Sequence, residues 1–252
     1  MKINILTLFP KMFDGFLTNS IIKRAISKKV VTINIINIRD YTKDKYKRVD
    51  TPPVSGGAGL IMKCQPIVDA LKKTGGHKVL LSPRGKTYSE VKAKEFSKLK
   101  ELTIVCGHYE GVDERVNKYV DELISIGDYV LTGGEVASMA IADSVIRLLK
   151  GAITNASLDN ESFNDNLLEY PQYTEPYNYK GDKVPDVLYS GNHKVINRYN
   201  KKQQLKLTKK YRPDLFNKIK LSKEDIKLLN EKDYTKLELD AIKKGKKYIP
   251  NK

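Results

Sequence analysis

The chain has 252 residues, 40% of them hydrophobic, which is enough to bury a core in one large domain or in one domain with a smaller appendage. Its apolar runs fall well short of the roughly 18 residues that a membrane-spanning helix needs, which excludes an integral helical membrane protein. The formal net charge of +16 favours a polyanionic partner, such as nucleic acid or an anionic membrane face, over a lysine-rich composition without a partner.

The N-terminus predicts a strand rather than a leader peptide. Ile3–Leu8 is short and apolar, and the chain breaks at Pro10 without a small-residue cleavage site, so we expect a soluble, cytoplasmic protein with no membrane partner. Cys64 and Cys106 lie far apart, with no CxxC motif and no His/Cys cluster. This pattern argues against a disulfide framework and against a zinc site.

Strands and helices alternate over the first 150 residues. After Ile3–Leu8, apolar residues at helical spacing predict a helix over 12–17. Further strands are predicted at Val30–Ile38, Val79–Leu81, Thr103–Cys106 and Leu123–Ile126, and further helices at Ile67–Lys73, Tyr88–Lys100 and from Glu135 to about Lys150. This alternation is typical of a mostly parallel α/β sheet.

Glycine-rich turns punctuate this pattern at Ser55–Gly59, Ser82–Gly85, Cys106–Gly111 and Ile126–Glu135. The last three follow predicted strands directly, and loops at the carboxyl ends of strands are where open α/β sheets bind ligands. The chain has no GxxxxGK[ST] motif and no GxGxxG motif after the first strand, which argues against kinases, GTPases and ordinary Rossmann enzymes. Each cluster alone is consistent with a tight turn, but together they suit a ligand held by main-chain groups.

The C-terminal third has a different character. Residues 154–166 are polar, residues 170–187 are rich in proline and tyrosine, and the pattern is helical from Lys194 onward. Helices are predicted near Val195–Lys210, Pro213–Ile219, Lys223–Asn230 and Tyr234–Lys244. Residues 171–252 carry 21 Lys and Arg against 10 Asp and Glu. We therefore expect an α/β domain over 1–153, a flexible linker over 154–169 and a basic helical domain over 170–252.

Six runs of sequence carry a family resemblance: LFPKMFDGFL, VSGGAGLIMKCQPIVDAL, LLSPRGKTYS, IVCGHYEGVDERV, SIGDYVLTGGEVASMAIADSVIRL and VPDVLYSGNHKVI. In order and spacing they resemble the bacterial tRNA (guanine-37-N1)-methyltransferases of the SPOUT superfamily. The likeness covers most of residues 1–215, and CGHYEG and IGDYVLTGGE are its most specific parts. It implies a deep trefoil knot in a mostly parallel sheet, and a small helical C-terminal domain that binds tRNA. The activity it implies is methylation of N1 of guanosine 37 with S-adenosylmethionine.

The resemblance also assigns the cofactor site to three loops, Leu81–Gly85, Cys106–Gly111 and Ile126–Gly134. In similar enzymes main-chain groups recognise the adenine, and glycine allows close approach. The implied cofactor-binding residues are Leu81, Ser82, Pro83, Gly85, Gly107, Tyr109, Gly111, Ile126, Gly127, Asp128, Tyr129, Val130, Leu131, Gly133 and Gly134. The glycines among them could equally serve the turns of the knot, and the two roles are compatible.

The chemistry calls for a base and a cation. N1 of guanine carries a proton at neutral pH, so its removal by a base is worth roughly 10²- to 10⁴-fold in rate. The charge that then develops on O6 favours a fixed cation. The resemblance assigns the base to Glu161, where the family has Asp, and the cation to Arg147. Asp159 and Asp165 are alternative bases.

Helical spacing offers another role for Arg147, and the resemblance adds a role for Glu110. Arg147 could instead pair with Asp143 four residues earlier on its helix. The family places Glu110 near the methyl group and the target base, where a carboxylate could help bind Mg²⁺, an ion that such enzymes use. The enzymes of this family act as homodimers, with the target guanine held between the cofactor loops of one subunit and the catalytic groups of the other.

The sequence departs from the family at several positions that bear on RNA. His108 and Glu175 stand where many relatives have Arg, and Tyr199 replaces a Trp. Affinity for tRNA is therefore expected to rest on the lysines of 201–220 and to weaken steeply with salt. For Asn192 a helix-capping role is at least as well supported as an RNA contact. Two alternatives remain, another SPOUT RNA methyltransferase and a non-catalytic RNA-binding protein.

Overall fold

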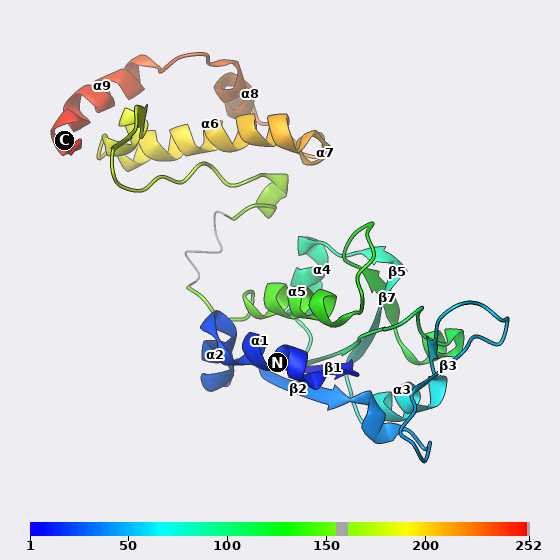
Figure 1. The fold of residues 1–252 in the computed structure, drawn as a ribbon. Helices are drawn as coiled ribbons and strands as arrows, with labels where there is room; N and C mark the ends of the chain where they lie inside the picture. The colour runs from blue at the N-terminus through cyan, green and yellow to red at the C-terminus, as the bar shows by residue number, and fades with distance from the viewer. Residues whose placement is uncertain (155–160, 251–252) are drawn as a thin grey trace. The chain divides into compact units, whose positions relative to one another are not determined.

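The computed structural model describes residues 1–154 and 161–250. The chain divides into two compact units, Met1–Asn155 and Ala156–Lys252 (Figure 1). Among the described helices, none combines the length and the apolar character needed to cross a bilayer.

The N-terminal unit is built on a five-stranded sheet with the order β2-β1-β6-β5-β7, in which every neighbouring pair is parallel. Its strands are β1 (Lys2–Thr7), β2 (Thr32–Asn37), β5 (His77–Thr87), β6 (Glu101–Val105) and β7 (Glu122–Ser125). A short antiparallel pair, β3 (Asp50–Thr51) and β4 (Ile61–Met62), lies outside this sheet. The predicted mostly parallel α/β sheet is thus confirmed. The trefoil knot stays a prediction.

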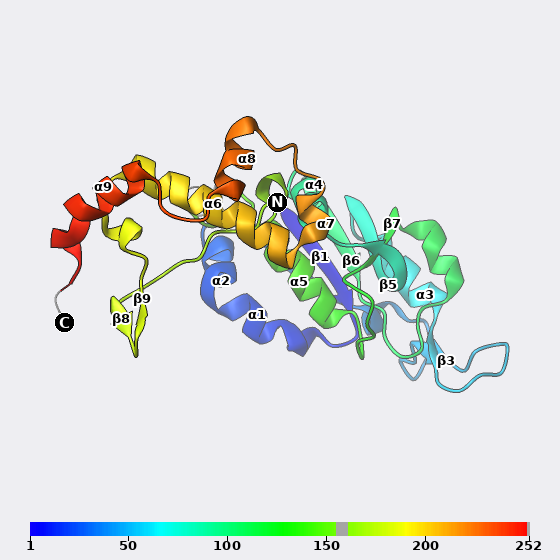
Figure 2. The same cartoon turned by 90° about the horizontal axis from the view of Figure 1, so that it is seen from above.

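Helices cover both faces of the sheet (Figures 1 and 2). Side chains alternate along each strand, so Ile3 and Ile5 of β1 join one apolar cluster and Leu6 joins the other. The first cluster includes residues of α2 (Ser20–Ser27), α4 (Glu90–Phe96) and α5 (Glu135–Ile146). The second includes residues of α3 (Cys64–Leu71) and of the 3-10 turns η2 (Ile38–Tyr41) and η3 (Glu114–Tyr119). The first helical stretch of the chain consists of η1 (Pro10–Phe13) and α1 (Asp14–Thr18).

Ser82–Gly85, predicted as a turn after a strand, lies inside β5, which continues to Thr87. Leu81 and Lys86 both pair with Ile124, so the four residues between them form a turn that leaves the ladder. The pairing with β7 shifts register after Leu81 and resumes with Lys86 opposite Ile124. A side chain at Gly85 would overlap the main chain of Ile124. The strand can therefore pass this close to β7 because residue 85 is glycine.

The C-terminal unit is helical, as predicted, with a small hairpin. Its elements are η5 (Asn164–Asn166), β8 (Asn178–Tyr179), β9 (Asp182–Lys183), η6 (Asp186–Tyr189), α6 (His193–Tyr211), α7 (Pro213–Phe216), α8 (Lys223–Asn230), α9 (Lys236–Gly245) and η7 (Lys246–Tyr248). Asn192 caps α6, since its side chain accepts a hydrogen bond from the Val195 nitrogen at 3.3 Å. The capping interpretation of Asn192 is thus confirmed.

Two small apolar clusters hold this unit together. One gathers Val187, Val195, Tyr199, Ala241 and Ile242, and the other gathers Leu167, Leu205 and Leu228. The segment before the hairpin packs onto α6, because Leu167 is buried there and the Leu168 nitrogen donates to the Thr208 hydroxyl at 2.9 Å. Residues from about 161 onward therefore belong to the packed body of the unit.

A buried ionic network ties α6 to the start of α9. Arg198 donates to Glu231 and, at 3.2 Å, to Glu238, whose side chain is fully buried. Lys202, also buried, lies 3.5 Å from Glu231 and donates to the main-chain oxygen of Asp233 at 3.1 Å. The hydrogen bond from Arg198 is the main cause that lowers the pKa of Glu231. Buried charges are tolerated when they are paired in this way.

Candidate functional site

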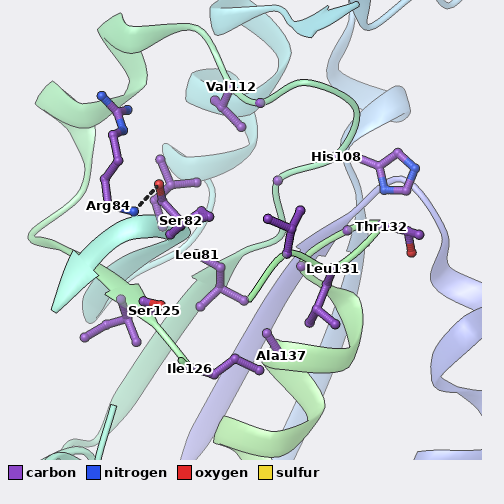
Figure 3. Close-up of a pocket in the computed structure, with 18 of the residues that line it drawn as sticks. Leu81, Ser82, Arg84, His108, Val112, Ser125, Ile126, Leu131, Thr132 and Ala137 are labelled. Carbon is purple, nitrogen blue, oxygen red and sulfur yellow. Dashed lines mark hydrogen bonds between the residues drawn. The ribbon is translucent and has the colours of Figure 1, made fainter. Parts of the chain in front are cut away.

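A cavity of about 450 Å³ opens beside the turn inside β5 and the ends of β6 and β7 (Figure 3). Its walls come from the turn inside β5, the loop after β6 and the loop between β7 and α5. Loops from neighbouring parallel strands converge at this edge of a sheet, which makes it the usual place for a ligand.

Most of the residues assigned to the cofactor from sequence meet in this cavity. The lining includes Leu81, Ser82, Pro83, Gly107, Tyr109, Gly111, Ile126, Gly127, Tyr129, Val130, Leu131, Gly133 and Gly134, together with Glu110. Gly85 and Asp128 lie outside the lining. Gly85 packs against β7 instead, and the side chain of Asp128 is exposed.

The two loops that begin after β6 and β7 contact each other through their main chains. The Gly134 nitrogen donates to the Gly107 oxygen at 2.8 Å, and His108 forms an isolated antiparallel bridge with Gly133. A Cβ atom at Gly134 would lie 2.8 Å from Cys106 Cα, closer than ordinary contact allows. Cys106 itself is fully buried, which raises the pKa of its thiol. Gly134 therefore has a packing role of its own.

Gly107 differs from Gly134 because a side chain there would meet ordinary contacts. The nearest atoms to an ideal Cβ are Val112 Cγ2 at 3.4 Å and the Leu81 oxygen at 3.6 Å, and both residues line the cavity. The protein would tolerate a methyl group at this position. The absence of a side chain at Gly107 leaves space at the cavity wall, and a ligand can approach the main chain closely there.

The loop that follows β7 presents apolar side chains beside the cavity. Gly127 has a φ of 151°, and the Ser125 hydroxyl accepts from the Gly127 nitrogen at 3.2 Å, which shapes the start of the loop. Tyr129 and Val130 are exposed. Figure 3 shows Leu81, Ile126, Leu131 and Ala137 around one hollow. An apolar hollow between main-chain loops suits a flat aromatic ring with polar edges, such as a purine.

A polar pair that the sequence prediction missed lies beside this cavity. Glu135, at the first position of α5, is 2% exposed and accepts a hydrogen bond from the Thr7 hydroxyl at 2.7 Å. Its other oxygen lies 3.7 Å from Nδ1 of His108, whose ring sits 4.7 Å from the ring of Phe9. A carboxylate at a helix N-terminus is favourable. The sequence carries one signal for Glu135, because it is an acid that directly follows Gly133 and Gly134 at the start of the helix.

Glu110 joins the cavity to the glycine-rich turn at 55–59. Its nitrogen donates to the Leu60 oxygen at 3.0 Å, and a side chain at Gly59 would collide with its carboxylate arm. Within the described residues, no group of three or more His, Cys, Asp or Glu side chains could hold a metal ion. Glu110 is therefore the start of a metal site at most, with waters and substrate as the remaining ligands.

Glu161 lies in the C-terminal unit, at the edge of a second and more polar cavity of about 370 Å³. Asp165 also lines it, as do Asn197, Asn200 and Gln204 of α6. The neighbouring Ser162 hydroxyl accepts from the Glu169 nitrogen at 3.0 Å, which fixes the turn that carries Glu161. Asp159 lies outside the described residues.

Arg147 lies in the N-terminal unit, directly after α5, and its nitrogen donates to the Asp143 oxygen at 3.0 Å. It is partly buried. The main chain of α5 thus fixes the position of Arg147, which caps the C-terminal end of this helix about three turns beyond the cavity-lining Ala137.

Comparison with known proteins bears directly on this site. The family model described as tRNA (Guanine-1)-methyltransferase TrmD matches residues 1–218. This chain belongs to the TrmD family. It is 55% identical to a tRNA (guanine-N(1)-)-methyltransferase of Clostridium perfringens strain 13 over 237 residues, which is 92% of this chain and all of that protein. Proteins of the same name from Clostridium tetani and Clostridium botulinum strain Langeland are 52% identical over 92% and 94% of this chain and 99% of their own lengths.

The part of this TrmD chain that matches the family model includes both cavities and the whole of α6 and α7. Tyr199 packs inside the C-terminal unit with its ring 6.2 Å from that of Tyr234, and burial raises its pKa to about 12. Position 199 therefore holds an aromatic core residue.

The lysines of 201–220 differ in their surroundings. Lys202 is buried in the ionic network, and Lys206 donates to the Glu231 oxygen at 2.9 Å. Lys209 and Lys210, at the end of α6, are exposed. Lys202 takes part in the ionic network inside the unit. The expectation that the lysines of this range contact RNA therefore does not extend to Lys202.

Proposed function

We propose that this chain transfers the methyl group of S-adenosylmethionine to N1 of the guanosine at position 37 of tRNA. The observation that carries the proposal is the cavity beside the turn of β5 and the ends of β6 and β7, in which the three motif-bearing segments converge. Membership of the TrmD family and the names of the relatives support tRNA guanine-N1 as the target.

The cavity fits the methyl donor in size and in chemistry. Its volume of about 450 Å³ falls within the range of small-molecule sites. Ile126, Leu131 and Ala137 would contact the adenine faces, while main-chain groups of the loops after β6 and β7 would bind its polar edge. S-adenosylmethionine supplies a methyl group on a positively charged sulfur, so the protein needs no covalent intermediate of its own.

Two side chains of this protein would do the remaining chemistry. The Glu161 carboxylate would accept the N1 proton of guanine, which leaves a lone pair on N1 for the new bond to the methyl carbon. The carbon–sulfur bond would break in the same displacement, and its electron pair would leave with sulfur as a neutral thioether. The Arg147 guanidinium donates to O6, where negative charge develops as that proton leaves. A glutamate in place of the family's aspartate keeps the acid and lengthens its arm by one methylene.

The arrangement also implies partners. Arg147 and Glu161 belong to different units, and we propose that a homodimer assembles each site from the cofactor cavity of one subunit and catalytic groups of the other. Mg²⁺ would take Glu110 as its single protein carboxylate, which fits an ion that keeps most of its waters. No step of the proton transfer depends on it.

Methyl transfer to tRNA transcripts with guanine or another base at position 37 tests the proposal. Label should enter the guanine-containing transcript alone. Glu161→Gln should slow single-turnover methylation by about 10²- to 10⁴-fold, while Asp165→Asn, in the same cavity, should stay close to wild type. Equal losses in the two variants would take the role of base away from Glu161. A chain that binds tRNA but not S-adenosylmethionine in calorimetry would be an RNA-binding protein without this activity.

A further inference from the structure

A small turn of the N-terminal unit, Lys43–Arg48, presents an aromatic ring among positive charges. Its sequence, KDKYKR, holds four cations and one acid. Tyr46 at its tip is 73% exposed, among the most exposed large side chains of the described chain. An exposed aromatic side chain within a basic segment is typical of a surface with a binding partner.

The turn is held in a defined shape in spite of its exposure. The Asp44 carboxylate accepts from the Tyr46 nitrogen at 2.8 Å and from two guanidinium nitrogens of Arg48 at 2.9–3.2 Å. Arg48 holds the pKa of Asp44 well below its usual range, so this clamp stays ionised at neutral pH. Inside the turn, the Lys47 nitrogen donates to the Asp44 oxygen at 3.0 Å.

Further hydrogen bonds anchor the turn to the body of the unit. The Lys43 nitrogen donates to Gln65 on α3 at 3.2 Å, and the Thr42 hydroxyl donates to the Arg48 oxygen at 2.9 Å. Arg39 reaches the Lys47 oxygen at 3.3 Å. A loop that only connected two elements would not need this many restraints, and the result is that Tyr46 is presented at low entropic cost.

The positions of the charges indicate which partner this platform suits. The Lys45 nitrogen and the Arg48 guanidinium lie 5.9 and 5.5 Å from the centre of the Tyr46 ring, and Lys47 is exposed beside them. Single-stranded nucleic acid offers a flat base to stack on an aromatic ring and flanking phosphates for lysines. A protein partner would need acidic side chains to face the net charge of +3, and a buried interface would deplete lysine.

We propose that the Lys43–Arg48 turn is an RNA-contact site on the N-terminal unit, in which an unpaired base of the substrate tRNA stacks on Tyr46 and the neighbouring phosphates contact Lys45 and Lys47. The identity of the RNA rests on the proposed function. The site adds a contact outside the basic C-terminal unit and outside the cofactor cavity.

Replacing the ring separates stacking from simple apolar contact. Equilibrium binding of a fluorescent tRNA transcript by the full chain should be within twofold of wild type for Tyr46→Phe and about tenfold weaker for Tyr46→Leu, because leucine keeps apolar bulk but offers no π face. Lys45→Gln should reduce the slope of log affinity against log salt by about one. Melting temperatures should match wild type, since these side chains are exposed.

Replacing Asp44 gives a sharper test, because the change in net charge and the loss of the turn's hydrogen bonds predict opposite effects on tRNA affinity. Asp44→Ala makes the chain more positive by one, so electrostatics alone predicts tighter binding to tRNA. The platform predicts weaker binding, since the turn loses the acceptor that fixes Tyr46 and Arg48. Tighter binding by Asp44→Ala would overturn the proposal.

Two other results would also overturn it. One is wild-type affinity for tRNA in Tyr46→Leu, and the other is a change in sedimentation of that variant in the absence of RNA, which would make the turn a contact between protein chains. Wild-type protein that fails to methylate tRNA yet binds it through Tyr46 would instead refute the proposed function and leave this site standing.

Discussion

Gly134→Ala is expected to destabilise the N-terminal unit through a single misplaced methyl group. An ideal Cβ at this position lies 2.8 Å from Cys106 Cα and 3.1 Å from the Gly107 nitrogen, and main-chain atoms cannot rotate away. Overpacking of this kind costs about 1–3 kcal/mol. Each kcal/mol lowers the melting temperature of a unit of this size by about 2–4 °C, so the melting temperature should fall by about 2–12 °C.

Gly107→Ala is the matched control, because its new methyl group meets Val112 at an ordinary 3.4 Å. Its melting temperature should stay within about 2 °C of wild type. Its affinity for S-adenosylmethionine should nevertheless fall about tenfold, since the methyl group stands at the cavity wall. Calorimetry measures both quantities. If Gly134→Ala melts as wild type does, or if Gly107→Ala is the less stable of the two, the packing argument is wrong.

Other changes separate the buried charges of the C-terminal unit from the exposed ones. Arg198→Met should cost about 3–5 kcal/mol in urea unfolding, because it leaves the buried Glu238 without its cation and Glu231 with Lys202 alone. A loss below about 1 kcal/mol would show that solvent already screens the network. Because Arg198 lowers the pKa of Glu231, the pair contributes its full stability above the ordinary carboxyl pKa and loses it as the pH falls through the lowered one. The melting temperature of this unit should therefore fall in acid, and it should fall less in Arg198→Met. Lys209→Gln should lower the slope of log affinity for tRNA against log salt by about one and leave the stability of the unit unchanged. Lys202→Gln should lower the stability and leave that slope unchanged. Equal salt slopes in both lysine variants would contradict this division.

The parts of the fold that could be predicted from sequence are those set by short-range pattern. Alternation along β1 places Ile3 and Ile5 on one face of the sheet and Leu6 on the other, and this period of two is visible in the sequence. The N-cap of α6 follows from one side chain, Asn192, and its own next turn. The order of strands and glycine-rich turns was enough to predict that ligand loops share one edge of a sheet, where the cavity lies.

The parts that could not be predicted depend on contacts between distant residues. The hydrogen bond from Thr7 to Glu135 joins positions 128 apart, so neither residue carries a local signal of its partner. β5 runs past its apolar stretch because β7 pairs with Lys86 beyond the bulge, which the polar sequence there conceals. In the sequence, Lys202 cannot be told from the other lysines of α6. Its burial depends on the loop that carries Glu231, which is distant in sequence.

The product nucleoside is the most direct test of the central claim. A tRNA transcript with guanine at position 37 is incubated with the full chain and S-adenosylmethionine, digested to nucleosides and resolved by mass spectrometry. The account predicts 1-methylguanosine, which should be absent when the transcript has another base at that position. A methyl group on ribose, on a different ring atom or at another position, or no methylation at all, would contradict it.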